Sequence, residues 1–207
     1  MHKKTLFVVS CLFLILFSSP ASGAEGFYLG FNVGFGYLND ATVQQNDAGN
    51  TVETEFDSGL DFSGVFGYDF GAPRVEAEIG YLKNDIDKLS TQGTTVFGNG
   101  DASSWRFMVN GYVDIENRSS VTPYFGAGIG FAKVSVDNLN ISNYTLGSES
   151  DTVFAYNFKA GIGWEIVEPV VLDLGYQYYA TVSPELGAYT MEYGAHIISL
   201  GIRYTFK

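Results

Sequence analysis

Histidine and cysteine, two residue types that often carry catalysis, are scarce in this sequence. His196 is the only histidine after residue 24, and the only cysteine is Cys11. A histidine can act as the base for a serine nucleophile, and the nearest serine is Ser199. On an extended strand these two residues point to opposite faces, so they form no such dyad. Zinc-ligand spacing, a phosphate-binding loop and a nucleophile elbow are also missing from the sequence. We therefore predict no catalytic, cofactor-binding or metal-binding residue.

Charged residues within apolar stretches are the other candidates for chemistry. An isolated buried charge is costly, so charges in such positions must pair with one another or stay hydrated. Six of them lie well inside the stretches, and we predict that they form an ion-pair network: Glu76, Glu78, Arg106, Lys159, Asp173 and Arg203. Whether they can meet depends on the elements that carry them.

These elements are predicted to be β-strands. The stretch FYLGFNVGFGYL (27–38) has a large apolar or aromatic residue at every second position from Phe27 to Tyr37, with mostly small or polar residues between. Successive side chains of a strand point to opposite faces, so such a strand has one apolar face and one polar, glycine-rich face. Eight stretches follow this period: 26–38, 58–70, 73–83, 104–115, 121–134, 153–166, 170–180 and 194–206.

Residues 1–24 differ from the rest of the chain. Two lysines near the start are followed by an apolar stretch (6–17) and then by small residues. This pattern predicts a secretory signal peptide, removed after Gly23 or Ala24, whose apolar core is too short to span a membrane. The remaining domain, 25–207, has a formal charge of −14, against −12 for the whole chain, because the signal segment carries two lysines and no acid. That acidic balance argues against a nucleic-acid partner.

The strands and their connections predict a barrel in a membrane. Each strand is long enough for the roughly 9–11 tilted residues that cross a bilayer, and short connections alternate with long polar ones. The long connections are 39–57, 84–103, 135–152 and 181–193. Because an unpaired strand edge is costly in hydrocarbon, the sheet must close. We predict an all-β fold, an eight-stranded antiparallel up-and-down transmembrane β-barrel with both termini on the periplasmic side.

A soluble eight-stranded barrel, with its apolar face turned inward around a ligand, is the alternative fold. The glycines Gly126, Gly128 and Gly130 oppose it, because an outer face in water would be expected to carry charged side chains instead. Aromatic residues near strand ends, such as Trp105 and Trp164, favour membrane interfaces. With the apolar face toward lipid, the predicted ion-pair network lies in the lumen and blocks free diffusion.

The same parity places the remaining candidates. Charges near the strand ends are predicted to lie in interfacial water: Asp69, Arg74, Asp114 and Glu165. Asp61 also faces the lumen. His196 shares the parity of Ile198, so we expect it to be a structural residue on the outer face, near the membrane interface.

Several segments resemble the porin-like, opacity-type outer-membrane β-barrel family. They are FSGVFGYDFGAPRVEAEIGY (62–81), VTPYFGAGIGFAKV (121–134), DTVFAYNFKAGIGWEI (151–166), VVLDLGYQYY (170–179) and HIISLGIRYTF (196–206). The resemblance implies a small eight-stranded barrel in the outer membrane of a Gram-negative bacterium, exposed at the surface and often antigenic or adhesive. It also implies that Tyr204 and Phe206 belong to the C-terminal signal that the barrel-assembly machinery reads.

We therefore expect a non-enzymatic integral outer-membrane protein with a structural or surface-interaction role, adhesin-like or antigen-like. Its expected partners are outer-membrane lipid and lipopolysaccharide, with the barrel-assembly machinery during biogenesis; the extracellular ligand is unknown. The alternative is a narrow porin or small-solute channel, since many lumen glycines would leave space. An outer-membrane enzyme is the third and most distant possibility.

Overall fold

A computed structural model describes residues 25–206, except for 39–40, 46–50, 57, 92–93, 142–143, 146–148, 183–184, 187–188 and 192. The predicted signal peptide, residues 1–24, and Lys207 lie outside the described residues. Eight long strands form the molecule: β1 (Gly26–Leu38), β4 (Gly59–Asp69), β5 (Pro73–Thr91), β6 (Thr94–Asp114), β7 (Val121–Ile141), β9 (Glu149–Val167), β10 (Val170–Thr181) and β13 (Gly194–Thr205). Five short strands accompany them: β2 (Ala41–Gln45), β3 (Thr51–Phe56), β8 (Tyr144–Thr145), β11 (Glu185–Leu186) and β12 (Tyr189–Met191).

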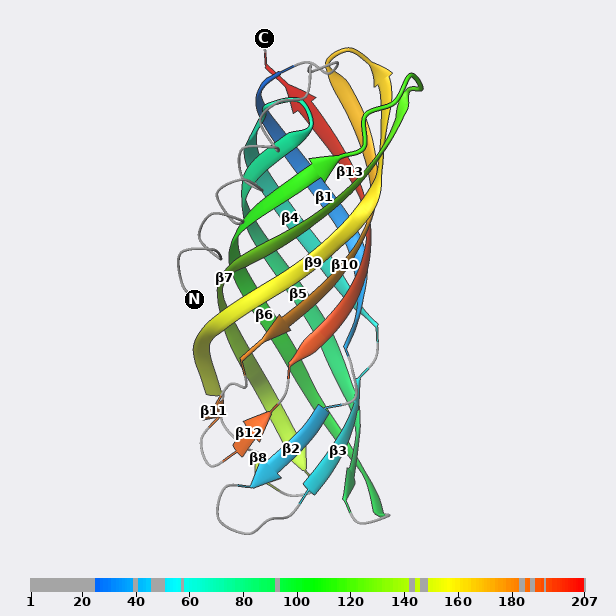
Figure 1. Ribbon diagram of the computed structural model, residues 1–207. Coiled ribbons are helices and arrows are strands. Elements are labelled where there is room, and N and C mark those ends of the chain that lie inside the picture. The colour runs from blue at the N-terminus through cyan, green and yellow to red at the C-terminus, as the bar shows by residue number, and fades with distance from the viewer. Residues whose placement is uncertain are drawn as a thin grey trace, which may run out of the picture.

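The eight long strands form one closed antiparallel barrel (Figure 1). Each pairs with the next long strand along the chain, and β1 pairs with β13 to close the ring. Closure leaves no strand edge along the wall, as hydrocarbon requires. The predicted eight-stranded up-and-down barrel is confirmed. Among the described residues no helix is both long and apolar enough to cross a membrane.

The hydrogen-bond register fixes the tilt of the strands. Cross-strand partners lead once around the barrel from Tyr28 back to Leu38 on β1, a stagger of ten residues; the partners between them are Gly67, Glu76, Asn110, Gly128, Asn157, Tyr179 and Ala195. A stagger of this size in an eight-stranded barrel corresponds to strands tilted by about 40°. Every residue on this path faces the lumen. Because of the stagger, the inward side chains along the path lie closer to the loop end on each successive strand.

The two ends of the barrel differ. At the turn end lie the start of β1, the end of β13 and the short connections at 70–72, 115–120 and 168–169. At the other, the loop end, β2 pairs with β3 and β12, and β3 pairs with β5, so that these segments extend the wall beyond the barrel (Figure 1).

The strands near the loop end are longer than the sequence pattern predicted. Residues 84–103 were expected to be a loop, but β5 continues to Thr91 and β6 begins at Thr94. Likewise, β7 continues to Ile141 and β9 begins at Glu149. Outside hydrocarbon a paired strand needs no continuous apolar face, so the alternation that reveals the membrane segment ends before the strands do.

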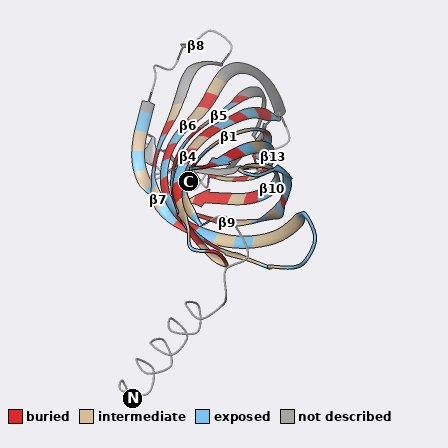
Figure 2. Cartoon of the chain, turned by 90° about the horizontal axis from the view of Figure 1, so that it is seen from above, coloured by how far each residue is buried: buried red, intermediate tan, exposed pale blue. Residues whose placement is uncertain are grey.

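Exposed and buried residues alternate along the strands (Figure 2). The outward face is a nearly continuous apolar surface; Phe35 is 67% exposed and Ile198 is 62% exposed. The outward aromatic residues concentrate toward both edges of this surface, for example Tyr37 and Trp105 at one edge and Trp164 and Phe206 at the other. A soluble protein would not leave such a surface in water, whereas a lipid bilayer covers it.

Candidate functional site in the barrel lumen

Arg106 on β6 is the centre of the charged residues in the lumen. Its side chain is fully buried. Two of its guanidinium nitrogens, Nη1 and Nη2, donate to the carboxylate oxygens of Asp61 on β4, at 2.5 and 3.0 Å. Its Nε donates to Glu78 on β5 at 2.8 Å. This bidentate geometry is the strongest that a guanidinium and a carboxylate can form, and it offsets the cost of removing the charges from water.

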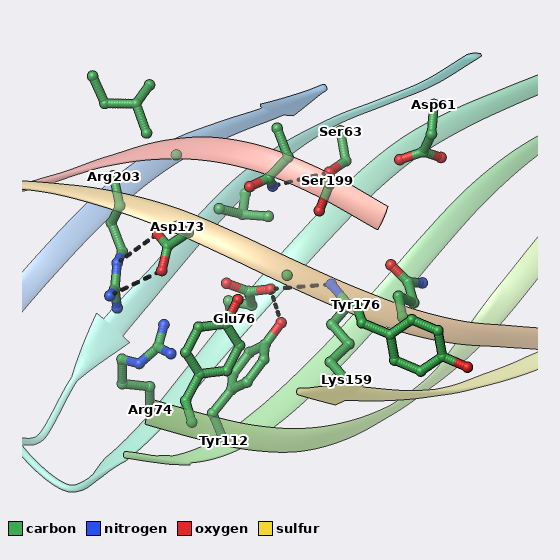
Figure 3. Close-up of a pocket in the computed structure, with 17 residues that line it drawn as sticks. Asp61, Ser63, Arg74, Glu76, Tyr112, Lys159, Asp173, Tyr176, Ser199 and Arg203 are labelled. Carbon is green, nitrogen blue, oxygen red and sulfur yellow. Dashed lines mark hydrogen bonds and ion pairs between the residues drawn. The ribbon is translucent and has the colours of Figure 1, made fainter. Parts of the chain in front are cut away.

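Glu76 on β5 is the centre of a neighbouring group. The hydroxyls of Tyr28 and Tyr112 donate to its two carboxylate oxygens, with a distance of 3.0 Å for Tyr28. Lys159 on β9 lies 3.7 Å from Glu76 (Figure 3). It also donates to Glu78, which links this group to Arg106. We call Asp61, Glu76, Glu78, Arg106 and Lys159 the lumen network. Its three carboxylates and two cations come from four different strands.

Asp173 and Arg203 form a separate pair nearer the turn end. Arg203 on β13 lies 3.4 Å from Asp173 on β10, measured from Nε to Oδ2 (Figure 3). The Arg203 guanidinium also lies 5.3 Å from the ring centre of Tyr28, whose hydroxyl binds Glu76. The structure thus brings four of the six predicted residues into direct contact, while the other two form a pair of their own, joined to Glu76 through Tyr28.

Arg74 and Asp114 form a further pair, which corrects a prediction. Arg74 donates from Nε and Nη2 to the two oxygens of Asp114, at 2.7 and 3.0 Å. Its guanidinium lies 4.7 and 5.2 Å from the ring centres of Tyr112 and Tyr124. Because the Arg74 side chain is only 4% exposed, the prediction that this pair lies in interfacial water was wrong. Aromatic faces and a carboxylate take the place of water around the cation.

The other two charges near strand ends have different surroundings. Asp69 is half-buried and accepts a hydrogen bond from the backbone nitrogen of Gly71 at 2.8 Å. Gly71 has a positive φ of 96°, which fits a tight turn. Glu165 is exposed at the turn end.

Glycines on the inner face leave room for long side chains to pass over the neighbouring strand and contact the strand beyond it. Arg106 on β6 passes over Gly80, its partner on β5, to reach Asp61 on β4. A Cβ at Gly80 would lie 2.4 Å from the Arg106 guanidinium carbon. In the same way Tyr28 on β1 crosses Gly67 on β4, where a Cβ would lie 2.4 Å from its ring.

The same arrangement occurs on the next strands around the barrel, β6, β7 and β9. Asn110 on β6 crosses Gly128 on β7 and accepts a hydrogen bond from Asn157 on β9 at 3.0 Å. Its own amide donates to Glu76 and Glu78, at 3.1 and 2.9 Å. The space that the glycines were expected to leave for solutes is therefore filled by side chains at these positions.

An apolar layer occupies the lumen mostly on the loop side of the network; Met108, which pairs with Glu78, reaches the level of the network itself. Fully buried side chains from several strands pack there; they are Leu38, Leu82, Ala102, Met108, Ala132, Val134, Ala155, Tyr179, Tyr193, Ala195 and Ile197. We call this set the apolar layer. Tyr179 joins it to the network: its ring lies 5.6 Å from the Arg106 guanidinium, and its hydroxyl lies 3.0 Å from that of Ser104.

Two cavities lie on the turn side of the apolar layer, and no residue of that layer lines either one. The first has a volume of about 50 Å³ and is bordered by the network, by Gln177 and by Ser199 (Figure 3). That volume holds only a few water molecules. The second, about 140 Å³, lies at the turn end and is bordered by acidic residues, including Asp69 and Glu165, and by Arg203.

The remaining candidates are placed as follows. His196 lies on the outer face beside the rings of Tyr176 and Tyr178, and its Nδ1 is 2.6 Å from the Tyr176 hydroxyl. Ser199, in contrast, borders the first cavity in the lumen. Tyr204 and Phe206 are exposed on the outer face with ring centres 5.1 Å apart. No group of three or more His, Cys, Asp or Glu within the described part of the chain is arranged to hold a metal ion.

Sequence reasoning missed the neutral polar residues of the site. Tyr28, Asn110, Tyr112 and Asn157 have the same inward parity as the charges, but no single strand shows what they touch. The signal that could have identified them is the cross-strand register. Several of these residues pair with a glycine on the neighbouring strand, and that pairing is known only when the register is known.

A closed barrel with an apolar wall and a charged, filled lumen defines a small integral protein of the outer membrane. The chain belongs to the family described as "Outer membrane protein beta-barrel domain", whose profile matches residues 9–206. The predicted family and the outer-membrane location are thereby confirmed.

Individual relatives agree with this assignment. The chain is 30% identical over 200 residues to outer membrane protein PagN of Salmonella typhimurium, covering 84% of this chain and 83% of that protein. It is 25% identical to a putative adhesin of Rickettsia rickettsii, covering 97% and 99%. Among solved structures, Neisserial surface protein A superposes with a TM-score of 0.59 at 19% identity, covering 89% of this chain and 100% of that one. That likeness supports the fold.

Proposed function

We propose that this protein is a non-enzymatic surface-interaction protein, in which the barrel is a closed scaffold and the segments at the loop end bind an extracellular ligand. The observation that carries the proposal is the filling of the lumen. The lumen network and the apolar layer occupy successive levels of the interior, and the cavities between them and the turn end are small. A barrel filled in this way holds its loops rigidly instead of conducting solutes.

The loop end has the architecture of a binding surface. Strands β5, β6, β7 and β9 continue past the apolar surface, and β2, β3 and β12 add to the same sheet. Segments held by a rigid scaffold are where binding residues commonly occur. The similarity to a putative adhesin along nearly the whole chain supports a role in attachment.

The orientation and biogenesis form part of the proposal. The loop end faces outward and the turn end, with both termini, faces the periplasm, as short periplasmic turns and long extracellular loops are typical of such barrels. Residues 1–24 direct export and are removed after Gly23 or Ala24. Tyr204 and Phe206 serve as the signal for the barrel-assembly machinery, and lipopolysaccharide surrounds the outer edge of the barrel.

Absence of catalysis is the last part of the proposal. His196, the one histidine of the mature chain, binds the hydroxyl of Tyr176 on the outer face, while Ser199 lies on the lumen side. These two side chains cannot act on one substrate, because the barrel wall separates them.

Attachment by cells that display the protein tests this function. Two variants carry short turns in place of 41–56 or of 185–191, the segments that contain β2–β3 and β11–β12. We expect the full-length protein to increase binding of a host bacterium to cultured cells or matrix, and at least one variant to lose that increase while folding normally. Equal attachment with and without the full-length protein would contradict the proposal.

A narrow channel is the second candidate, favoured by the 140 Å³ cavity open to the turn end. It requires the apolar layer to open. Liposomes that contain the refolded protein would then swell in small sugars or amino acids at a rate above that of protein-free liposomes. We expect no difference between the two preparations.

A further inference from the structure

Few charged side chains face outward on the part of the barrel wall that the structure describes, and two of them, Lys83 and Lys133, are basic. Among the strand residues whose side chains the structure describes, Lys83 and Lys133 are the only lysine or arginine residues that face away from the lumen. Four of the other basic side chains that the structure describes face the lumen: Arg74, Arg106, Lys159 and Arg203. Arg118 lies in the turn between β6 and β7.

The register places Lys133 directly beside Trp105 and places Lys83 diagonally across from it. Lys83 on β5 pairs with Ser103 on β6, and Lys133 on β7 pairs with Trp105, two residues farther along β6. Two strand spacings and this offset separate their backbones by about 12 Å. Trp105 on β6 is the cross-strand partner of both Lys133 and Tyr81. The rings of Trp105 and Tyr81 lie 4.8 Å apart.

Both lysines lie at the edge of the apolar surface nearest the loop end. Each follows, two residues along its strand, an outward aromatic residue: Tyr81 precedes Lys83, and Phe131 precedes Lys133. Aromatic rings such as that of Trp105 settle at the membrane interface, and lysines beyond them extend their ammonium groups to the level of the lipid headgroups.

We propose that Lys83 and Lys133 bind the phosphate groups of lipopolysaccharide in the outer leaflet, with Trp105 and Tyr81 packed against the sugar and upper acyl chains. This inference rests on the proposed orientation and specifies which lipid contacts this wall. The chain as a whole is strongly acidic, with a net charge of −12, so this wall is the place where an anionic headgroup meets cations. No described basic residue on the other strands could replace them at this level.

One acidic neighbour is compatible with the site. Lys83 forms an ion pair with Asp101 on β6 at 3.1 Å, but both side chains remain exposed, 46% and 36%. Exposed pairs of this kind are weak, so a phosphate that approaches from the lipid side can share the ammonium group.

The fluorescence of Trp105 gives a direct test. The chain has two tryptophans, and in a W164F background Trp105 is the only one. Refolded protein in a neutral detergent is titrated with bisphosphorylated lipid A, with dephosphorylated lipid A and with phosphatidylglycerol. The variants are K83Q/K133Q and, as a control that removes a positive charge at the other end of the barrel, R118Q. Heat-modifiable gel migration verifies that each variant is folded.

We expect bisphosphorylated lipid A to bind the parent most tightly, and R118Q to bind it equally well. Each lysine near an anionic surface contributes roughly fivefold, so K83Q/K133Q should bind about tenfold to thirtyfold more weakly. Equal affinity of the parent and K83Q/K133Q would overturn the proposal, as would equal binding of the dephosphorylated lipid or of phosphatidylglycerol. The assay uses purified protein without host cells, so its failure leaves the attachment role untouched.

Discussion

Arg106 is the fully buried cation of the lumen network, and its one guanidinium binds two buried carboxylates. It binds Asp61 through two nitrogens and Glu78 through a third, and its charged group lies beside the ring of Tyr179 in the apolar layer. Removing one member of this group should therefore lower the stability of the barrel more than removing its charged members together.

Removing the cation alone should destabilise the barrel strongly. R106M leaves Asp61 and Glu78 buried without their main partner, and we expect the free energy of unfolding to fall by about 3–5 kcal/mol. Urea unfolding in detergent micelles or bilayers measures this change. The triple variant D61N/E78Q/R106M, which removes the charges together, should recover much of the loss. R118M, in the exposed turn between β6 and β7, should change stability little. A loss equal in R106M and in the triple variant would contradict the network.

Filling the crossing point of Arg106 should also be costly. G80A places a methyl group 2.4 Å from the guanidinium carbon, which forces the side chain to shift. We expect a loss of about 1–3 kcal/mol in the same unfolding measurement, as is usual for overpacking. The control is G111A on the adjacent strand, where a Cβ meets no atom within 4 Å. If the two variants were equally stable, Gly80 would have no role in the crossing.

The two faces of each barrel strand have different surroundings, and β13 is a clear example. Ile197 is fully buried in the apolar layer, while Ile198 beside it is 62% exposed on the outer wall. The inward face of this strand also carries Arg203, near the turn end. Within a single strand the lumen face therefore changes from apolar to charged along the barrel axis.

Substitution of these neighbouring isoleucines separates the two environments. I197A leaves a cavity among closely packed side chains and should cost about 2–5 kcal/mol. I198A exposes no cavity, because lipid chains fill the space, and should cost clearly less. Unfolding of both variants in the same bilayer measures the difference. Equal losses would mean that the apolar layer is not closely packed.

The sequence predicted the strands and their faces well, because alternation is local to each strand. The inward parity of Glu76, Glu78 and Arg106 followed from it directly. Which residues meet could not be predicted, because the contact of Arg106 with Asp61 crosses an intervening strand and depends on the register and stagger of the whole barrel. The burial of Arg74 was missed for a related reason: a position near a strand end gives no sign of the three tyrosines that surround it.

The whole molecule combines an apolar wall, a filled lumen and an extended loop end. Its apolar layer was not predicted, since inward apolar residues such as Leu38 and Leu82 interrupt the polar face only near the loop end. Beyond hydrocarbon the same strands continue without the alternation that reveals them. The sequence therefore predicted the membrane-spanning part more accurately than the part on which a binding function depends.

Single-channel recording in planar bilayers tests the closed scaffold most directly. The refolded protein is compared with protein-free bilayers and with the variant that carries a short turn in place of 41–56. Because the lumen network and the apolar layer lie within the barrel and not in the loops, we predict no large, stable open conductance from either protein. A large, stable open state of the wild-type protein would contradict the closed lumen and favour the channel.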